Sequence, residues 1–318
     1  MPATSLASPA VTHTTKTILD TVLESAIILG RRRIAMVYPC DLASLQIAAE
    51  LQAQGIANIV LVGPLNSLIA LSSVHHINLS LFELIDSGPH VSGAAQIACE
   101  LARSGEVDML MKGSLHTDDL MRAVVSRTYG LRTGGRVSHA FVLQLPDRLQ
   151  PLIISDCVVN VAPTLSEKVE ILQLALKLAR ALGIEKPRAA ILSFTESILC
   201  SVQSTLDAAV IAKMAERGQI EDALVDGPLA FDNAVSATSA ASKGIQSDVA
   251  GHADILLVPN LETGNALYKS LIYMAGAKCA GVVLGTRTPI ILTSRTDSME
   301  SKLYSAALAC LLLDPISE

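Results

Sequence analysis

The chain has 318 residues, of which half are hydrophobic and 17% are charged, a composition typical of globular proteins and not of disordered ones. Its formal net charge is −6 and only 3% of its residues are aromatic, so neither a basic face nor a stacking platform for nucleic acid is expected. No apolar run reaches the roughly 20 residues that a membrane helix needs, whereas the length is ample for two domains.

Short apolar runs alternate with helical patterns through the first part of the chain. The spacing predicts a helix over 15–28, a strand over 34–38, a helix over 41–54, strands over 58–63 and 82–87, a helix over 92–104 and a strand over 108–113. Continuous apolar strands separated by helices indicate a parallel sheet covered on both faces.

The pattern changes at 137–156. Two apolar runs, 137–145 and 152–156, are separated only by a polar turn between Pro146 and Pro151, which predicts a hairpin. We interpret it as a break between two three-layer αβα domains with mostly parallel sheets. The first would comprise residues 1–150 plus about 294–318, the second residues 151–293, with the active-site cleft between them.

The second part resumes the alternation. A capping box at Thr164–Glu167 opens a long helix that Gly183 closes. Strands are then predicted over 189–194, 223–227, 254–259, 280–285 and 289–293, and helices over 205–217, 229–242, 262–275 and 299–313.

Cysteine usage and the N-terminus bear on the compartment. The six cysteines lie far apart without a CxxC pair, and residues 1–16 lack the basic and apolar regions of a secretory signal. We therefore expect a cytoplasmic protein whose thiols are reduced and mostly fill the core, with a mobile tail over residues 1–14.

Common cofactor motifs are missing. The sequence holds no GxGxxG, no GxxxxGK[ST] and no HExxH, and its seven histidines are dispersed. Dinucleotide redox chemistry and zinc hydrolysis therefore have little support, and we expect neither a metal nor a cofactor.

Polar residues follow several strands, where ligands bind in open α/β sheets. After DMLM (108–111) come Lys112, Ser114, His116 and Thr117, in a turn suited to binding an anion at a helix N-terminus. Thr117 or Asp118 could instead be a simple helix cap, which leaves Lys112 unexplained because a cation opposes the helix dipole there.

Three arginines in residues 127–136 form a local excess in an acidic protein. Either they are solvated or they contact phosphate, with Arg132 as the candidate ligand. After the hairpin, Asp156 and Asn160 are interpreted mainly as hydrogen-bonding supports, with Asn160 also a candidate substrate contact. Cys157, between them, is either a core thiol or a nucleophile, and no histidine is near it in sequence.

Two later segments carry further candidates. Asn265 and Lys269 lie four residues apart and share a helix face, which meets either solvent or a ligand. Ser294 and Arg295 follow a buried strand, and a hydroxyl beside a guanidinium can hold an anion and a polarised carbonyl together. In the alternative interpretation, Ser298 caps the next helix and Arg295 is solvated.

Five blocks together resemble the phosphate acetyl/butyryltransferase family: MKGSLHTDDLMRAV (111–124), SDCVVNVAPT (155–164), VDGPLAFDNAVS (225–236), PNLETGNALYKSL (259–271) and LGTRTPIILTSRTDS (284–298). The last block, with the residues that follow it, is closer to the butyryltransferase-like branch. The resemblance implies reversible acyl transfer between CoA and phosphate by a homodimer with two αβα domains and no metal.

The resemblance also assigns roles. The functional Ser-Arg pair falls on Ser294 and Arg295, and a substrate-binding arginine falls on Arg122. The acetyl branch has a catalytic Asp where this chain has Ser301, so Glu300 or Asp297 is the candidate base for the CoA thiol. Two alternatives remain: a non-catalytic acyl-CoA-binding regulatory module of the same fold, and a metal-dependent decarboxylating dehydrogenase.

Overall fold

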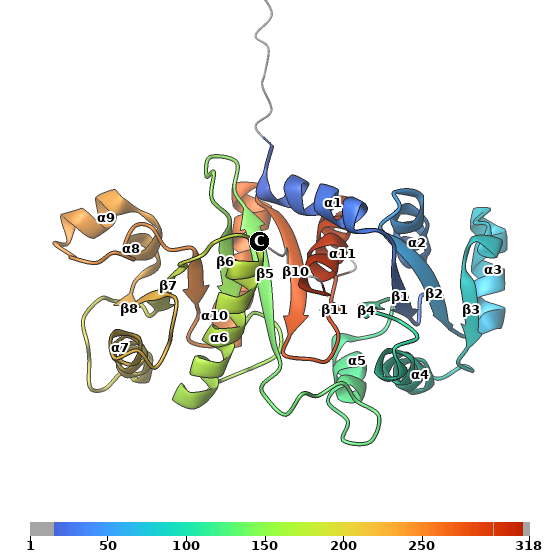
Figure 1. Ribbon diagram of the computed structural model, residues 1–318, viewed down its shortest axis with the longest axis horizontal. Coiled ribbons are helices and arrows are strands. Elements are labelled where there is room, and N and C mark those ends of the chain that lie inside the picture. The colour runs from blue at the N-terminus through green and yellow to red at the C-terminus, as the bar shows by residue number, and fades with distance from the viewer. Residues whose placement is uncertain (1–15, 295, 314–318) are drawn as a thin grey trace, which may run out of the picture.

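The computed structural model describes residues 16–294 and 296–313, and in this part of the chain eleven strands form one sheet that runs along the whole length of the molecule (Figure 1). The order of the strands is β3-β2-β1-β4-β11-β10-β5-β6-β9-β7-β8. Their bounds are β1 Arg32–Val37, β2 Ala57–Gly63, β3 Glu83–Asp86, β4 Met109–Lys112, β5 Ser138–Gln144, β6 Leu152–Ser155, β7 Arg188–Leu192, β8 Leu224–Leu229, β9 Ile255–Leu257, β10 Lys278–Leu284 and β11 Ile290–Ile291.

The sheet consists of two parallel blocks joined by antiparallel strands. β3, β2, β1, β4 and β11 are parallel to one another, and so are β6, β9, β7 and β8. The pairs β11–β10, β10–β5 and β5–β6 are antiparallel, so the two parallel blocks run in opposite directions. The mixed α/β class, the mostly parallel sheet and the predicted β5–β6 hairpin are confirmed.

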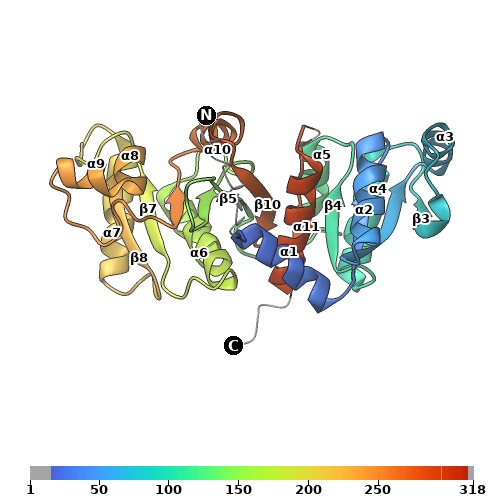
Figure 2. The same ribbon diagram turned by 90° about the horizontal axis from the view of Figure 1, so that it is seen from above.

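Helices cover both faces of this sheet (Figure 2). Their bounds are α1 Ile18–Leu29, α2 Leu42–Ala53, α3 Leu65–His75, α4 Val91–Ser104, α5 Thr117–Val124, α6 Leu165–Ala181, α7 Gln203–Glu216, α8 Phe231–Val235, α9 Ala237–Ser242, α10 Leu261–Ala275 and α11 Met299–Leu313, with a 3-10 turn at Leu79–Leu81.

The two faces are packed differently. On one face, α1, α2, α3, α6, α7 and α11 share a single apolar core that extends through both blocks of the sheet. On the other face the core is split: α4 and α5 cover one part, and α8, α9 and α10 cover the other. Val158, in the loop after β6, packs against both parts. The division in this second layer leaves room at the centre of the molecule.

Local signals account for most element boundaries. Thr164 caps α6, and the predicted capping box with Glu167 is present. The single helix expected over 229–242 is wrong: Ser236 has an extended backbone (φ −123°) and its side chain caps α9, so α8 and α9 are separate. α3 was not anticipated, because it buries only Leu68 and Ser72 and so has a weak periodic pattern.

The last helix returns to the first part of the chain. α11 begins at Met299, as predicted, and lies beside α1 and β10 (Figures 1 and 2). β11 pairs with β4, so residues just before 294 also lie in the first block of the sheet. The division into domains over 1–150 with 294–318 and over 151–293 stays a prediction, since one continuous sheet joins both. None of the helices in the described ranges is long and apolar enough to cross a membrane.

Candidate active site

A cavity of about 370 Å³ lies where the second helix layer is divided, and we call it the central cavity. It is bounded by the segments after β4 and β11, by β5, by the loop after β6 and by α10. Its lining residues are Lys112, Leu115, His116, Thr117, Phe141, Val158, Asn265, Tyr268, Leu292, Thr293, Ser294 and Asp297. Six residues predicted from the sequence therefore converge here: Lys112, His116, Thr117, Asn265, Ser294 and Asp297.

The last residue of β4 supplies a cation, and the turn after it leads to the start of a helix. Lys112 is only 8% exposed, and its Nζ donates to the carbonyls of Gly113 (3.3 Å) and Leu115 (3.1 Å). His116 is the N-cap residue of α5, but its side chain makes no capping hydrogen bond and is exposed. Ser114 differs from the prediction in placement: its Oγ donates to the Tyr38 carbonyl (2.8 Å), away from the cavity lining.

The segment after β11 forms a tight polar turn. The backbone N–H of Ser294 donates to Oδ2 of Asp297 (2.7 Å), and the Ser294 hydroxyl pairs with that of Thr296 (3.0 Å). Burial raises the pKa of the Asp297 carboxyl above its usual value, while the Ser294 N–H and nearby lysines partly offset that rise. The cavity thus has a hydroxyl and a carboxylate held on one turn. Arg295, between them, lies outside the described residues.

Glu300, the other candidate base, is placed elsewhere. It lines a neighbouring cavity of about 570 Å³, which shares Tyr268, Ser294 and Asp297 with the central one. Its carboxylate accepts from Lys278 Nζ (2.8 Å) and from the Tyr304 hydroxyl (3.0 Å). Lys269 lines this neighbouring cavity too. The geometry therefore puts Asp297, and not Glu300, at the central cavity.

Two predicted arginines do not line the central cavity. Arg122 has a side chain that is 78% exposed, and its Nη1 lies 3.4 Å from Asp119. Arg132 lines a separate cavity of about 310 Å³, together with Arg136 and Asn160. Roles for Arg122, Arg132 and Asn160 in substrate binding stay predictions.

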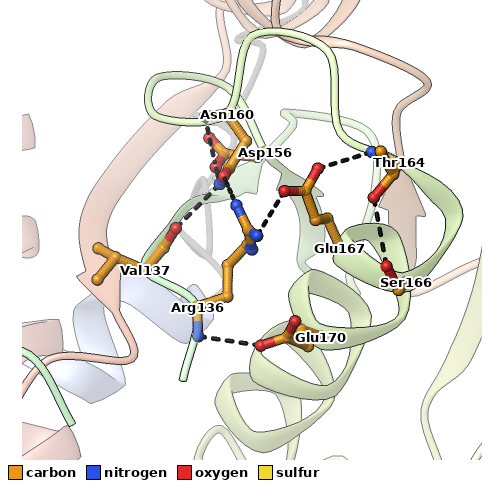
Figure 3. A network of polar contacts seen from close by, with 8 residues as sticks. All are labelled: Arg136, Val137, Asp156, Asn160, Thr164, Ser166, Glu167 and Glu170. Atoms are coloured by element: carbon orange, nitrogen blue, oxygen red, sulfur yellow. Dashed lines mark hydrogen bonds and ion pairs between the residues drawn. The ribbon is translucent and has the colours of Figure 1, made fainter. Parts of the chain in front are cut away.

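A polar network supports the loop that carries Val158 to the central cavity (Figure 3). Arg136 pairs with Glu167 (2.5 Å) and donates to Asn160 Oδ1 (3.1 Å), and Asn160 in turn donates to Asp156 (2.5 Å). Asp156 also accepts the backbone N–H groups at 158, 159 and 160. These contacts agree with the interpretation of Asp156 and Asn160 as supports. Arg136 was not singled out, although it belongs to the arginine cluster at 127–136.

Cys157 behaves as a core thiol. It is fully buried, and burial together with the neighbouring Asp156 charge raises the pKa of its thiol well above the ordinary value. A thiol that stays protonated is a poor nucleophile, so the nucleophile alternative loses its support.

The apolar part of the central cavity was not anticipated. Leu115, Phe141, Tyr268 and Leu292 are each at most 8% exposed yet line the cavity. Nothing in a sequence separates an apolar side chain at a cavity wall from one in the core. Only the pattern of polar residues at strand ends could have indicated the region.

Comparisons with known proteins identify the family of the chain. Residues 89–310 match the family described as Phosphate acetyl/butaryl transferase. A phosphate acetyltransferase from Rhizobium meliloti is 46% identical over 274 residues, covering 86% of each chain. A phosphate butyryltransferase from Clostridium acetobutylicum is 40% identical over 281 residues, 88% of this chain and 93% of that protein.

A solved structure extends the agreement to the fold. The branched-chain phosphotransacylase from Enterococcus faecalis V583 is similar with a TM-score of 0.78 and 28% sequence identity, covering 89% of this chain and 99% of that one. The resemblance drawn from the five sequence blocks is thereby confirmed, and this chain belongs to the phosphate acetyl/butyryltransferase family.

Proposed function

We propose that the protein is an acyltransferase that moves an acetyl or butyryl group reversibly between CoA and inorganic phosphate. Acyl-CoA and phosphate give acyl phosphate and CoA. The observation that carries this proposal is the convergence of Ser294, Asp297 and Lys112 on one partly apolar cavity, in a chain of this family. Such a cavity offers a hydroxyl donor, a base and a positive charge beside room for an acyl chain.

Charge is the first requirement of this reaction, because phosphate and CoA are both anions. Lys302, Lys112 and Lys269 lie near enough to Asp297 to offset part of the rise that burial causes in the pKa of its carboxyl, so positive charge lies near the turn. Arg295 is the next residue after Ser294. We assign the phosphoryl group to Arg295 and Arg122, since charge-assisted hydrogen bonds of this kind are worth roughly 1.5–3 kcal/mol each.

Arg122 can bind the phosphoryl group although it does not line the central cavity. Its contact with Asp119 is long, at 3.4 Å, and the side chain is mostly exposed. Exposed pairs of this kind contribute at most about 1 kcal/mol, so a bound anion can replace Asp119 as the partner.

Ser294 serves the acyl group. When phosphate attacks the thioester, negative charge develops on the acyl oxygen, and the Ser294 hydroxyl donates to it there. The hydroxyl now pairs with Thr296, which can accept or donate equally well. A hydroxyl rotates readily, so this contact does not prevent donation to substrate.

Asp297 serves the thiol in the reverse direction. CoA must lose its thiol proton before it attacks acyl phosphate, and a carboxylate whose pKa is raised by burial is a better proton acceptor than a solvated one. Transfer in a ternary complex needs no acyl-enzyme, in keeping with the buried, protonated Cys157. We further propose that the protein acts in the cytoplasm as a homodimer and requires no metal or cofactor.

A turnover assay tests the proposal. The purified protein is incubated with acetyl- or butyryl-CoA and phosphate, and free CoA and acyl phosphate are measured by chromatography, because exposed Cys200 would react with thiol reagents. We expect CoA release that depends on phosphate. Binding without turnover would favour the regulatory module, and activity dependent on NAD and a divalent metal would favour the dehydrogenase.

Arg295→Ala is the decisive variant. It should raise the phosphate KM strongly or abolish turnover, with an unchanged circular dichroism spectrum. Arg217→Ala, at the exposed end of α7, is the matched control and should leave the kinetics unchanged. Wild-type kinetics in the Arg295 variant would remove this residue from the mechanism.

A further inference from the structure

The apolar wall of the central cavity is a stacked pair of rings. Phe141, on β5, and Tyr268, on α10, lie with their ring centroids 4.0 Å apart and their planes inclined by 24°. Phe141 is 6% exposed and Tyr268 is 8% exposed, and both line the cavity. Neither ring is accounted for by the charges and hydroxyls that the reaction uses.

Three neighbours hold the Phe141 ring in place. Gly281 is its direct partner on β10, and a Cβ at that glycine would come within 2.7 Å of a Phe141 ring carbon. The ring therefore occupies the space that a side chain on β10 would fill. His139, two residues earlier on the same strand, lies against it at 4.6 Å between ring centroids, and the Tyr268 ring stacks on it at 4.0 Å. Because β10 at Gly281 and the rings of His139 and Tyr268 confine it, the Phe141 ring cannot move aside to make room for a longer acyl chain.

Three further apolar residues line the same cavity. Leu115 comes from the turn after β4, Val158 from the loop after β6 and Leu292 from the segment directly after β11. A surface of aliphatic and aromatic carbon favours an alkyl chain, with each buried methylene contributing about 0.8 kcal/mol. The polar lining residues Ser294, Asp297 and Lys112 favour the thioester and phosphate.

We propose, building on the function above, that the Phe141–Tyr268 ring pair is the end wall of the acyl pocket and restricts the substrate to short acyl chains. The size of the cavity supports this assignment. Its volume of about 370 Å³ is near the lower end of small-molecule sites, which run from about 300 to 1,000 Å³, and it must also hold the phosphoryl group. With the ring pair as its end wall, we expect chains of two to about four carbons to react faster than hexanoyl chains.

The test compares acyl-CoA selectivity in wall variants. The ratio of kcat/KM for hexanoyl-CoA to that for acetyl-CoA is measured in the wild type, in Phe141→Leu and in Phe141→Ala. We expect the ratio to rise by about 10-fold or more in Phe141→Ala, in line with the 10- to 200-fold that a methylene-sized change in a pocket produces, and by less in Phe141→Leu. A ratio is independent of the fraction of folded enzyme, so partial loss of stability does not disturb the comparison.

Phe82→Ala is the matched control. Phe82 is as buried as Phe141, at 7% exposed, but packs in the core on the other face of the sheet. It should lower the melting temperature without changing the hexanoyl-to-acetyl ratio. If Phe141→Ala does not fold, Tyr268→Leu replaces it and should shift the ratio in the same direction. An unchanged ratio in every wall variant would overturn the inference.

A binding measurement separates this inference from the proposed function. Dissociation constants for acetyl-CoA and hexanoyl-CoA are measured by calorimetry on the same proteins. If the wild type shows no turnover but the wall variants gain affinity for hexanoyl-CoA, the wall assignment holds and the catalytic proposal fails. If turnover is present but neither selectivity nor affinity moves with the variants, the wall assignment fails and the catalytic proposal stands.

Discussion

Ser294 and Asp297 are linked twice: the Ser294 N–H donates to the Asp297 carboxylate at 2.7 Å, and the Asp297 N–H donates to the Ser294 carbonyl at 3.2 Å. This turn follows β11 directly, so the central strands of the sheet determine its position. The hydroxyl and the carboxylate are consequently presented to the central cavity in a fixed relation, with Arg295 between them in sequence.

Asp297→Asn should reduce the rate of CoA attack on acyl phosphate by about 10- to 100-fold, at or below the lower end of the roughly 10²–10⁴-fold range for general bases, because a thiol needs only modest help. Burial raises the pKa of the Asp297 carboxyl, so the base is lost by protonation as pH falls through that raised value. The wild-type kcat/KM should therefore decline as the pH is lowered, and the kcat/KM of the variant should not show this decline. Glu300→Gln is the control and should still show the decline at low pH. If Glu300→Gln abolished the decline and Asp297→Asn kept it, the role of base would belong to Glu300.

Ser294→Ala should lower kcat by about 10²-fold, with little change in the phosphate KM, because its hydroxyl donates to charge that develops only in the transition state. Ser298→Ala is a useful comparison. Its Oγ accepts from the Ser301 N–H at 3.1 Å and caps α11, so its loss should cost about 1 kcal/mol of stability and leave kcat unchanged. Steady-state kinetics with denaturation curves distinguishes the two, and a normal kcat in Ser294→Ala would refute the donor role.

His139 should make the protein less stable in mild acid. It is fully buried on β5, neither ring nitrogen has a hydrogen-bond partner among the described residues, and burial lowers the pKa of its imidazole to about 3. The unfolded chain, with an ordinary histidine pKa near 6.5, takes up the proton as pH falls below that value, whereas the folded protein does not. Stability is therefore fully present above about pH 6.5 and should fall by about 2 kcal/mol between pH 7.5 and 5 from this residue alone.

Urea denaturation at the two pH values checks this prediction. In His139→Leu, most of the difference in free energy of unfolding between pH 7.5 and 5 that His139 causes should disappear. His252→Phe, at an exposed position, should show the same pH dependence as the wild type. An identical pH dependence in the His139 variant and the wild type would show that the imidazole is protonated within the fold.

Lys168 and Asp207 form a buried ion pair between α6 and α7, with 2.7 Å between Nζ and Oδ2 and side chains that are 6% and 5% exposed. Lys168→Met should cost about 3–5 kcal/mol, because it leaves the Asp207 charge buried without its cation. The double variant Lys168→Met/Asp207→Leu should recover most of that loss. Lys213→Met breaks an exposed pair with Glu216 and should leave the free energy of unfolding nearly unchanged. Equal losses in the single and double variants would contradict this account.

The sequence was a good guide to local structure and an incomplete one to the site. The capping box at Thr164 and the unbroken pattern of α11 could be assigned directly, since both depend on residues within a turn or two of each other. The break at Ser236 was missed because the helical pattern continues across it. Ser114 and Glu300 carry the right chemistry for the site, yet their side chains are engaged elsewhere, by the Tyr38 carbonyl and by Lys278.

By itself, the amino-acid sequence determined the α/β class, the order of most strands and helices, and the polar segments after β4 and β11, because periodicity, caps and strand ends are local properties. Only the tertiary structure decided that Asp297 rather than Glu300 meets the central cavity, and that Phe141 and Tyr268 form its wall. Those outcomes depend on which strands pair and which face each side chain takes, and contacts between residues far apart in the chain, such as Phe141 over Gly281, settle both.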